Sequence, residues 1–200
     1  MQLIVATRNA HKTREIEQIL GSALTVQDLT AHPEISEIAE SGESFEENAK
    51  LKAIAVSKQL PGLVIADDSG LEVEALEGAP GIHSARYAGP NASDKEKITK
   101  LLRQLAKAAA TSGRRRARFR CILAVAREGQ FLATFEGVVE GKIAEQPRGS
   151  RGFGYDPIFI PDGFEETFAE LPDELKNSIS HRANAIGKLQ AKLPMFYREA

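Results

Sequence analysis

Apolar residues follow two patterns along the chain, and each pattern predicts a different kind of element. Short apolar runs at residues 3–6 and 63–66, each followed by a polar turn, are typical of buried strands. Elsewhere apolar residues recur every three or four positions, which indicates amphipathic helices. These predicted helices span about residues 11–20, 45–59 and 95–109, and a last one repeats Ile186, Leu189 and Leu193 on one face.

Turn and capping residues mark the predicted ends of these elements. Gly21 is placed to cap the end of the first helix. Ser44 with Glu47 fits a capping box at the start of the second helix, which Pro61-Gly62 stops. The other helices also have hydroxyl residues available as N-caps: Ser93 for the third, and Ser178 or Ser180 for the last.

After residue 113 the patterning changes from helical to extended. Residues 118–126 and 130–139 are predicted strands joined at Glu128-Gly129, whose turn chemistry favours a hairpin. Polar or Gly/Pro-rich segments at 31–43 and 78–93 predict loops. The order of elements predicts a mixed α/β fold, and because there is no repeat or flexible linker, residues 1–200 are predicted to form a single domain.

Composition and charge exclude several classes of protein. The 200 residues are 42% hydrophobic and 27% charged, close to globular averages, so the chain is neither disordered nor fibrous. With a net charge of −2, the chain has no overall positive field that would attract nucleic acid or anionic lipid. No signal peptide is evident, no apolar stretch approaches the ~20 residues that span a bilayer, and the single Cys121 forms no internal disulfide. We therefore expect a cytoplasmic protein that contacts neither membrane nor nucleic acid directly.

A polar turn between the first strand and the first helix is the first candidate site. Backbone N–H groups at a helix start attract anions, and a lysine there adds a full positive charge. A hydroxyl, an amide and an ammonium in one turn suit a phosphate; in the alternative, Thr7 or Asn9 merely caps the helix. The turn consists of Thr7, Arg8, Asn9, Ala10, His11 and Lys12.

Carboxylates gather in two places and form the second candidate site. Acids near the start of the second helix are favoured there on structural grounds alone: Glu37, Glu40, Glu43, Glu46 and Glu47. Asp67 and Asp68 close the apolar strand at 63–66, where two adjacent acids cost stability unless they are paired. A carboxylate pair is the usual means of holding Mg²⁺ against substrate phosphates. Strand geometry turns only one aspartate toward a ligand; we favour Asp68, although spacing alone does not choose.

A glycine-rich segment at 152–157 contains two aromatic residues. Its glycines permit close backbone approach to a ligand, Phe153 and Tyr155 offer stacking surface, and Asp156 can accept from ring N–H groups. An ordinary turn before a strand explains the glycines but not the aromatic residues.

Residues 176–182 bring Lys176, His181 and Arg182, with two serines, to the start of the last helix. Such a group suits phosphate or a purine carbonyl, whereas an ordinary N-cap accounts for one serine only. A second basic run, with Arg114, Arg115, Arg116, Arg118 and Arg120, has a structural explanation as a solvated strand edge that discourages pairing.

Six blocks of the sequence, taken in order, resemble the inosine triphosphate pyrophosphatase family, whose members hydrolyse non-standard purine nucleoside triphosphates. Each block is weak alone, but together they cover nearly the whole chain. The blocks are Thr7-x-Asn9-x-x-Lys12, Glu40-x-Gly42-x-x-Phe45-x-Glu47-Asn48-Ala49, Ala66-Asp67-Asp68-Ser69-Gly70-Leu71, Gly78-Ala79-Pro80-Gly81-Ile82-x-Ser84-Ala85-Arg86-Tyr87, residues 152–157, and Ser180-His181-Arg182.

The resemblance implies an elongated, two-lobed α/β fold with a central mixed sheet flanked by helices, an active-site cleft between the lobes, and a homodimer. It implies Mg²⁺-dependent hydrolysis of ITP, XTP and their deoxy forms to monophosphate and pyrophosphate. By position, Asp68 would be the general base and a metal ligand, with Glu40 as the second metal ligand. The substrate would be held by Thr7, Arg8, Asn9, Ala10, His11 and Lys12 at the triphosphate, and by Ser69, Phe153, Gly154, Tyr155, Asp156, Lys176, His181 and Arg182 at the nucleotide.

Two positions depart from the family pattern. Arg151 stands where the family often has glycine, which predicts a stiffer loop, and Arg8 either contacts phosphate or points to solvent. Three alternative functions stay open: a non-catalytic nucleotide-binding regulator, a hydrolase of modified pyrimidine nucleotides, and an RNA-binding protein that uses the stretch from Arg114 to Arg120.

Overall fold

The computed structural model describes residues 2–108 and 115–198, apart from the side chains of Ala23 and Arg198. Their contacts divide the chain into two compact units. Unit 1 contains the described residues of 1–68, 121–137 and 181–200, and unit 2 contains those of 69–120 and 138–180.

Within the described residues, six strands form one sheet in the order β2-β1-β3-β4-β5-β6. Strand β1 is parallel to both β2 and β3, whereas β5 is antiparallel to β6. The predicted mixed α/β architecture is therefore confirmed. The strands are β1 (Gln2–Val5), β2 (Thr25–Asp28), β3 (Leu63–Val73), β4 (Arg116–Arg127), β5 (Gln130–Ile143) and β6 (Phe159–Pro161).

Five α-helices lie in the part of the chain that the structure describes: α1 (Ala10–Leu20), α2 (Phe45–Ser57), α3 (Asp94–Lys107), α4 (Asp173–Ile179) and α5 (His181–Arg198). Gly21 ends α1 with φ at 66° and donates its N–H to Glu17 O, as predicted. Ser93 and Glu96 complete a capping box at the start of α3. No described helix is long and apolar enough to cross a membrane.

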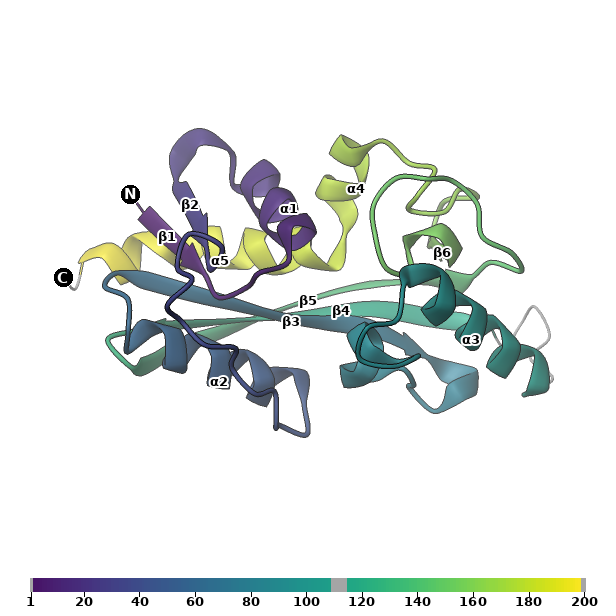
Figure 1. Cartoon of the computed structure of the whole chain (residues 1–200). Helices are drawn as coiled ribbons and strands as arrows, with labels where there is room; N and C mark the ends of the chain where they lie inside the picture. Colours follow the sequence, from purple (N-terminus) through teal and green to yellow (C-terminus); the bar gives the residue numbers. More distant parts are fainter. Residues whose placement is uncertain (1, 109–114, 199–200) are drawn as a thin grey trace. The chain divides into compact units, whose positions relative to one another are not determined.

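The core of unit 1 follows from the alternation of side chains along its strands. Leu3 and Val5 of β1 and Leu63 and Ile65 of β3 are buried in one cluster with α1 and α5. The intervening residues are buried too, and α2 lies on the other side of these strands, as Figure 1 shows. In the part of β3 that belongs to unit 1, residues 63 and 65 therefore face α1 and α5, and residues 64 and 66 face α2.

Unit 2 has a separate core that is rich in aromatic side chains. Phe119 of β4 meets Phe159 of β6 edge to face, with ring centroids 4.7 Å apart, and Phe159 lies 5.2 Å from Phe168. Leu101 and Leu105 of α3 are buried in the same cluster. Tyr155 of the glycine-rich segment is buried in this second core.

Several predicted boundaries are wrong, and the reasons are physical. The strand predicted to end at Asp67-Asp68 continues to Val73, because both aspartates have charged partners inside the fold. Strand β2, which is partly exposed and short, and α4, which has no side-chain cap, were not predicted. The second helix ends at Ser57 rather than Gln59. The predicted end of the third helix at Ala109 lies outside the described residues.

Candidate functional site

Strand β3 points two consecutive aspartates to opposite faces of the sheet. Asp67 shares the face of Ile65, toward α1 and α5, and is 1% exposed. Asp68 turns toward α2 and is 7% exposed. Because adjacent residues of a strand alternate in direction, the two carboxylates have different partners. This confirms that the aspartates diverge, as strand geometry predicted.

Asp68 belongs to a compact cluster with one lysine and one glutamate of unit 1. The Lys52 Nζ lies 3.2 Å from Asp68 Oδ1 and 2.8 Å from Glu40 Oε1. Burial raises the pKa of the Asp68 carboxyl, and the Lys52 ammonium works against that rise. The second oxygen, Oδ2, is buried without a hydrogen-bond partner among the described residues. A buried carboxylate oxygen in this state is an acceptor available to a ligand, a water or a metal ion.

The same carboxylates hold the lysine in its charged form. Burial alone would lower the pKa of Lys52, but Asp68 and then Glu40 outweigh it, so the pKa is raised. Lys52 also donates to the backbone carbonyl of Asp67 at 3.0 Å. Its ammonium is thereby fixed on three sides by acceptors.

Local contacts fix the backbone between Glu40 and the start of α2. The N–H of Gly42 donates to Asn48 Oδ1 at 2.8 Å, and a Cβ on Gly42 would lie 2.6 Å from the Cβ of Glu47, so only glycine fits. Ser44 caps the helix by accepting from Glu47 N at 3.2 Å. The reciprocal half of the predicted capping box is wrong, because the Glu47 carboxylate accepts from Glu43 N instead.

Asp67 lies at the centre of a second charged cluster in unit 1. Its Oδ1 accepts from Lys12 Nζ at 2.5 Å, and its Oδ2 accepts from Arg182 Nε at 2.7 Å. Cys121 Sγ lies 3.3 Å from the same Oδ2. Burial alone would raise the pKa of Asp67, but Arg182 and Lys12 together hold it well below its usual range. On the other side of Arg182, its Nη1 pairs with Glu15 of α1.

The turn before α1 is partly structural. Asn9 is the N-cap of α1, since its Oδ1 accepts from the N–H groups of His11 and Lys12 at 3.0 and 3.3 Å. Thr7 Oγ1 accepts from Asn9 N at 3.1 Å. The alternative interpretation of Asn9 as a cap is thus confirmed, and Ala10 is simply the first residue of the helix.

Arg8 neither contacts the other residues of its turn nor points freely into solvent. Its guanidinium donates to the backbone carbonyls of Leu29, His32 and Ile35. These hydrogen bonds fasten the loop after β2 to the turn, and the expected contact of Arg8 with phosphate stays a prediction.

In unit 2, the glycine-rich segment is organised around a buried ion pair. Asp156 Oδ2 accepts from Lys176 Nζ at 2.5 Å and from Phe153 N at 2.9 Å. A Cβ on Gly152, whose φ is 70°, would lie 2.0 Å from that same oxygen. Glycine is required at position 152 because its φ is positive and because a Cβ would overlap the Asp156 carboxylate. The fold of the segment therefore depends on Asp156.

The two aromatic residues of this segment differ in exposure. Tyr155 is buried, and its hydroxyl donates to Ser84 O at 2.9 Å. Phe153 is half-buried, with the Lys176 ammonium 5.2 Å from its ring centroid. Of the pair predicted to offer stacking surface, only Phe153 has an exposed part in this structure, and Tyr155 supports the segment from the core.

The predicted residues are divided between the two units. Those in unit 1 are Thr7, Arg8, Asn9, Ala10, His11, Lys12, Glu40, Asp68, His181 and Arg182, and those in unit 2 are Ser69, Phe153, Gly154, Tyr155, Asp156 and Lys176. His181 and Ser69 are buried and half-buried, respectively. Within unit 1, charged contacts join Glu40 to Asp68 through Lys52, and Lys12 to Arg182 through Asp67.

Sequence reasoning missed Lys52 and Glu15. Lys52 is in the buried stripe of α2, three residues after Ala49 and four before Val56, where a lysine needs an acidic partner. That misplaced charge was a usable signal. Glu15 precedes the buried Ile16 on α1 and had no comparable signal, because its partner Arg182 is 167 residues away.

The acidic cluster suits a metal ion that retains waters. No group of three or more His, Cys, Asp or Glu side chains able to hold a metal occurs among the described residues. Glu40 and Asp68, with the unpartnered Asp68 Oδ2, offer two carboxylates, which is the usual protein share of a site completed by substrate phosphates. The residues present therefore fit Mg²⁺.

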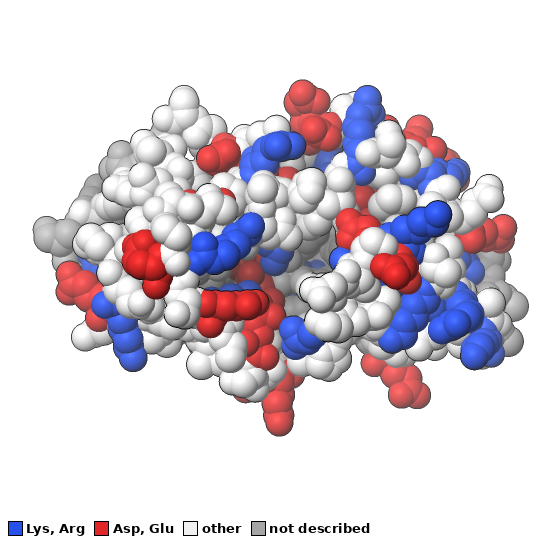
Figure 2. All heavy atoms as spheres, in the orientation of Figure 1, with Lys and Arg blue, Asp and Glu red and all other residues white. Residues whose placement is uncertain are grey.

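The arginine-rich stretch is ion-paired. Arg116 pairs with Asp162 at 2.6 Å and Arg118 with Glu72 at 2.6 Å, while Arg114 lies outside the described residues. Because β4 lies between β3 and β5, its interpretation as a sheet edge is wrong. Figure 2 shows acidic and basic side chains interspersed on the face it displays.

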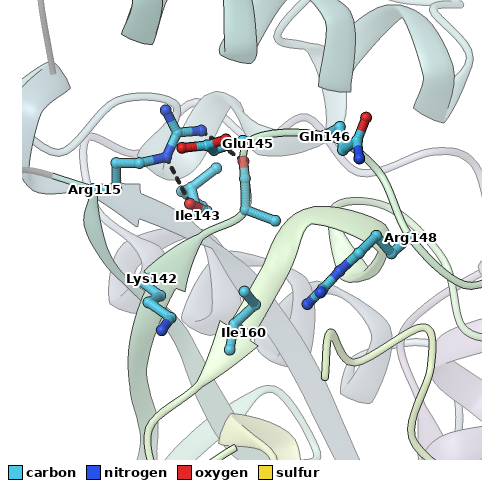
Figure 3. A pocket seen from close by; sticks show the side chains of 8 residues that line it. Arg115, Lys142, Ile143, Glu145, Gln146, Arg148 and Ile160 are labelled. Atoms are coloured by element: carbon cyan, nitrogen blue, oxygen red, sulfur yellow. Dashed lines mark hydrogen bonds between the residues drawn. The ribbon is translucent and has the colours of Figure 1, made fainter. Parts of the chain in front are cut away.

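A cavity of about 320 Å³ in unit 2 includes none of the predicted site residues. Its Arg115 donates to the carbonyls of Ile143 and Ala144 at 2.7 and 2.5 Å, so this side chain closes the end of β5 (Figure 3). The lining residues are Arg115, Lys142, Ile143, Ala144, Glu145, Gln146, Arg148 and Ile160.

A mixed sheet flanked by helices, with buried carboxylates held by lysines, defines an α/β protein equipped for acid–base chemistry on an anionic ligand. Residues 3–192 match the model of the Ham1 family, and the chain belongs to that family.

Similar proteins cover almost the whole chain. A dITP/XTP pyrophosphatase from Lactococcus lactis subsp. lactis (strain IL1403) is 47% identical over 193 residues, 96% of each chain. One from Listeria monocytogenes serovar 1/2a is 49% identical over 193 residues, 96% of this chain and 94% of that protein. Among solved structures, a HAM1 protein from Coxiella burnetii has a TM-score of 0.86 at 40% identity, covering 98% of this chain and 99% of that one. The Staphylococcus aureus Ham1 protein has a TM-score of 0.84 at 43% identity, covering 97% and 98%.

Proposed function

We propose that this chain is a nucleoside triphosphate pyrophosphatase that converts dITP, ITP and XTP into the monophosphate and pyrophosphate. The observation that carries the proposal is the buried Asp68 carboxylate, which is held by Lys52 beside Glu40 and has one oxygen left to accept. The relatives named dITP/XTP pyrophosphatase support the reaction and the substrate class. Such an enzyme keeps non-standard purines out of DNA and RNA.

Asp68 is the proposed general base. Its raised pKa makes it a stronger proton acceptor than an ordinary aspartate. The carboxylate takes a proton from water as the water oxygen bonds to the α-phosphorus and the bond to the bridging oxygen breaks. The electron pair of that bond leaves with pyrophosphate. Lys12 and Lys52 place positive charge next to Asp67 and Asp68, where they offset the charge of the phosphates.

Mg²⁺ is the proposed cofactor, held by Asp68 and Glu40. When bound, it neutralises phosphate charge and orients water. The two carboxylates share the Lys52 ammonium, so the lysine sets how much negative charge the ion meets. Both acids come from unit 1, so one unit carries the whole protein share of this metal site.

We further propose that the purine is held by residues of the glycine-rich segment. The half-buried Phe153 offers a stacking face, and the Asp156–Lys176 ion pair fixes the segment. Gly154, Tyr155 and Ser69 complete the proposed set of nucleotide-binding residues. A 6-oxo group accepts hydrogen bonds where the adenine amino group donates. A site with donors facing that oxygen disfavours adenine by about 1–3 kcal/mol per unpaired group.

The active protein is proposed to be a cytoplasmic homodimer in which each chain folds as one domain. Multi-angle light scattering of the purified chain checks the dimer; a monomeric mass at assay concentration refutes it.

Product analysis tests the reaction. The wild-type protein is incubated with ITP, XTP, GTP, ATP and dUTP, each with and without Mg²⁺. We expect pyrophosphate and monophosphate from ITP and XTP only, and only with the metal. Asp68→Asn is expected to abolish turnover while nucleotide binding stays measurable. Release of orthophosphate, turnover of dUTP instead of the purines, or unimpaired hydrolysis by Asp68→Asn would each refute the proposal.

A further inference from the structure

Asp94, the first residue of α3, is bonded to the glycine-rich segment at 152–157 within unit 2. Its Oδ2 accepts from the backbone N–H of Gly154 at 2.6 Å, and the two residues are 60 positions apart in the sequence. Its Oδ1 pairs with Lys97 Nζ at 2.6 Å on the same helix. One oxygen of this carboxylate therefore contacts its own helix, and the other holds the segment.

The segment needs such anchors because of its glycines. Gly152 and Gly154 have φ of 70° and 63°, and glycine loses more conformational freedom on ordering than any other residue. The N–H groups of Phe153 and Gly154 lie on either side of the Phe153 Cα. Asp156 Oδ2 accepts from the first at 2.9 Å, and Asp94 Oδ2 accepts from the second at 2.6 Å. Two carboxylates therefore fix the backbone on both sides of the Phe153 side chain.

The place of the Phe153 ring depends on this backbone. The residue is half-buried, and its ring centroid lies 5.2 Å from the Lys176 ammonium, a contact that leaves part of the ring exposed. A hydrogen bond to a charged acceptor is about twice as strong as one between neutral groups. Without the Asp94 carboxylate, the peptide after Phe153 would have to be ordered when a ligand binds, and that ordering lowers affinity.

We propose that Asp94 is a positioning residue for the nucleobase: by accepting from the Gly154 N–H, it orders the segment so that the Phe153 ring is in place before a nucleotide binds. This inference rests on the proposed function, in which Phe153 stacks on the purine. Because Asp94 acts on the segment that holds the base, its loss should weaken ligands that have a base and spare ligands that have none.

Two probes separate the base from the phosphates. The nucleotide dIMP has a base, whereas inorganic pyrophosphate has none. The affinity of each is measured by calorimetry with Mg²⁺ for wild type, for Asp94→Ala and for Asp94→Asn, whose amide oxygen can still accept from Gly154. The kcat and KM for dITP are measured in parallel. Glu96→Ala is the matched control, since Glu96 is an exposed acid in the same turn of α3 whose carboxylate accepts from Ser93.

The expected losses are confined to the base. The Asp94 side chain is 46% exposed, so the low end of the range for a hydrogen bond to a charged group applies. Asp94→Ala is therefore expected to weaken dIMP binding and to raise KM for dITP about tenfold. Its kcat and its pyrophosphate affinity are expected to stay within about twofold of wild type, as for a change in binding alone.

The two other variants separate the hydrogen bond from the stability of the helix. Asp94→Asn is expected to recover dIMP affinity to within about threefold of wild type, because an acceptor is retained. Glu96→Ala is expected to lower Tm, because a capping interaction is lost, while KM for dITP stays within about twofold of wild type.

Several results overturn the assignment. Wild-type dIMP affinity in Asp94→Ala means that the segment is ordered without this contact. Equal weakening of dIMP and pyrophosphate, or a KM for Glu96→Ala as high as that for Asp94→Ala, means that the change acts through the stability of unit 2. An Asp94→Asn variant as impaired as Asp94→Ala contradicts the role of the acceptor.

If Asp94→Ala does not fold, Asp94→Asn decides alone: dIMP affinity near that of wild type supports the assignment, and a loss of about tenfold overturns it. Failure of the proposed function is separable. Wild type would then hydrolyse no nucleotide, while the affinities for dIMP and pyrophosphate still decide the role of Asp94. A wild-type protein that binds pyrophosphate but not dIMP overturns the assignment.

Discussion

Substitution of Gly137 in β5 by alanine is expected to disturb the charged cluster around Asp67 in unit 1. A Cβ built there would lie 1.9 Å from the carbonyl oxygen of His181 and 2.4 Å from the backbone N of Ala185. Both atoms belong to the first turns of α5. Because they are backbone atoms, no side-chain rotation relieves the overlap, and the helix itself must move.

The magnitude follows from these distances. Restoring even a tight 3.0 Å contact from 1.9 Å displaces the start of α5 by about 1 Å, and this turn holds Arg182, whose Nε lies 2.7 Å from Asp67. Overpacking of a buried site costs ~1–3 kcal/mol. Stretching a hydrogen bond to a charged group costs ~1.5–3 kcal/mol more. Gly137→Ala is therefore expected to lose at least about 3 kcal/mol of unfolding free energy and roughly 6–12 °C in Tm.

Gly187 is the matched control, also on α5. A Cβ added there would meet no heavy atom within 4 Å outside its own stretch of helix, and the residue is exposed. Alanine in a helix interior is preferred to glycine, so Gly187→Ala is expected to gain about 0.5–1 kcal/mol. Urea unfolding and differential scanning calorimetry measure both variants. Wild-type stability in Gly137→Ala, or a loss in Gly187→Ala, would refute the close-packing argument.

Three further predictions concern the charged clusters. Lys52→Met is expected to lower kcat at least about 100-fold. It is also expected to lower the half-saturating Mg²⁺ concentration, because Glu40 and Asp68 lose the ammonium that they share. A titration of the rate with Mg²⁺ checks this, and an unchanged or raised half-saturating concentration contradicts it. Because the folded-state pKa of Asp67 is depressed, its contribution to stability is present above the ordinary aspartate pKa and is lost as the pH falls through the folded value. The stability deficit of Asp67→Asn, measured by urea unfolding, should therefore stay constant from about pH 7 to about pH 5 and shrink below about pH 5. A deficit that stays constant at the lowest pH argues against this linkage. Burial raises the pKa of the Cys121 thiol well above its usual value, and the residue is fully buried, so a thiol reagent should label it only in denaturant; labelling of the native protein at the same rate contradicts this.

The elements that the sequence predicted well are those whose signal is local. Helix α3 has a Ser93–Glu96 capping box, and Ile98, Leu101 and Leu105 repeat on its buried face. The turn at Glu128-Gly129 joins β4 to β5 with positive φ at both residues, as its chemistry predicted. In each case the residues that determine the structure lie within one or two turns of each other.

The failures share a different cause. Strand β3 contains two acids that a local pattern assigns to a turn, and only partners 55 and 115 residues away, Lys12 and Arg182, let Asp67 stay in a strand. The clustering of acids made Glu40 and Asp68 candidates, but their roles as metal ligands and, for Asp68, as general base came from the resemblance to a family. Their bridging Lys52 was missed, although its place between Ala49 and Val56 on α2 was a usable signal.

The two adjacent aspartates of β3 have different environments because successive side chains of a strand point to opposite faces. Asp67 lies between Lys12 and Arg182, so its pKa is depressed and its charge is used inside the protein. Asp68 faces the other side with a raised pKa and one buried oxygen without a partner among the described residues. If both carboxylates pointed to the same face, their like charges would repel each other and raise the pKa of one of them. The two aspartates could then not keep separate partners. The pleat of β3 thus places one carboxylate among buried cations and leaves the other available for the proposed proton transfer.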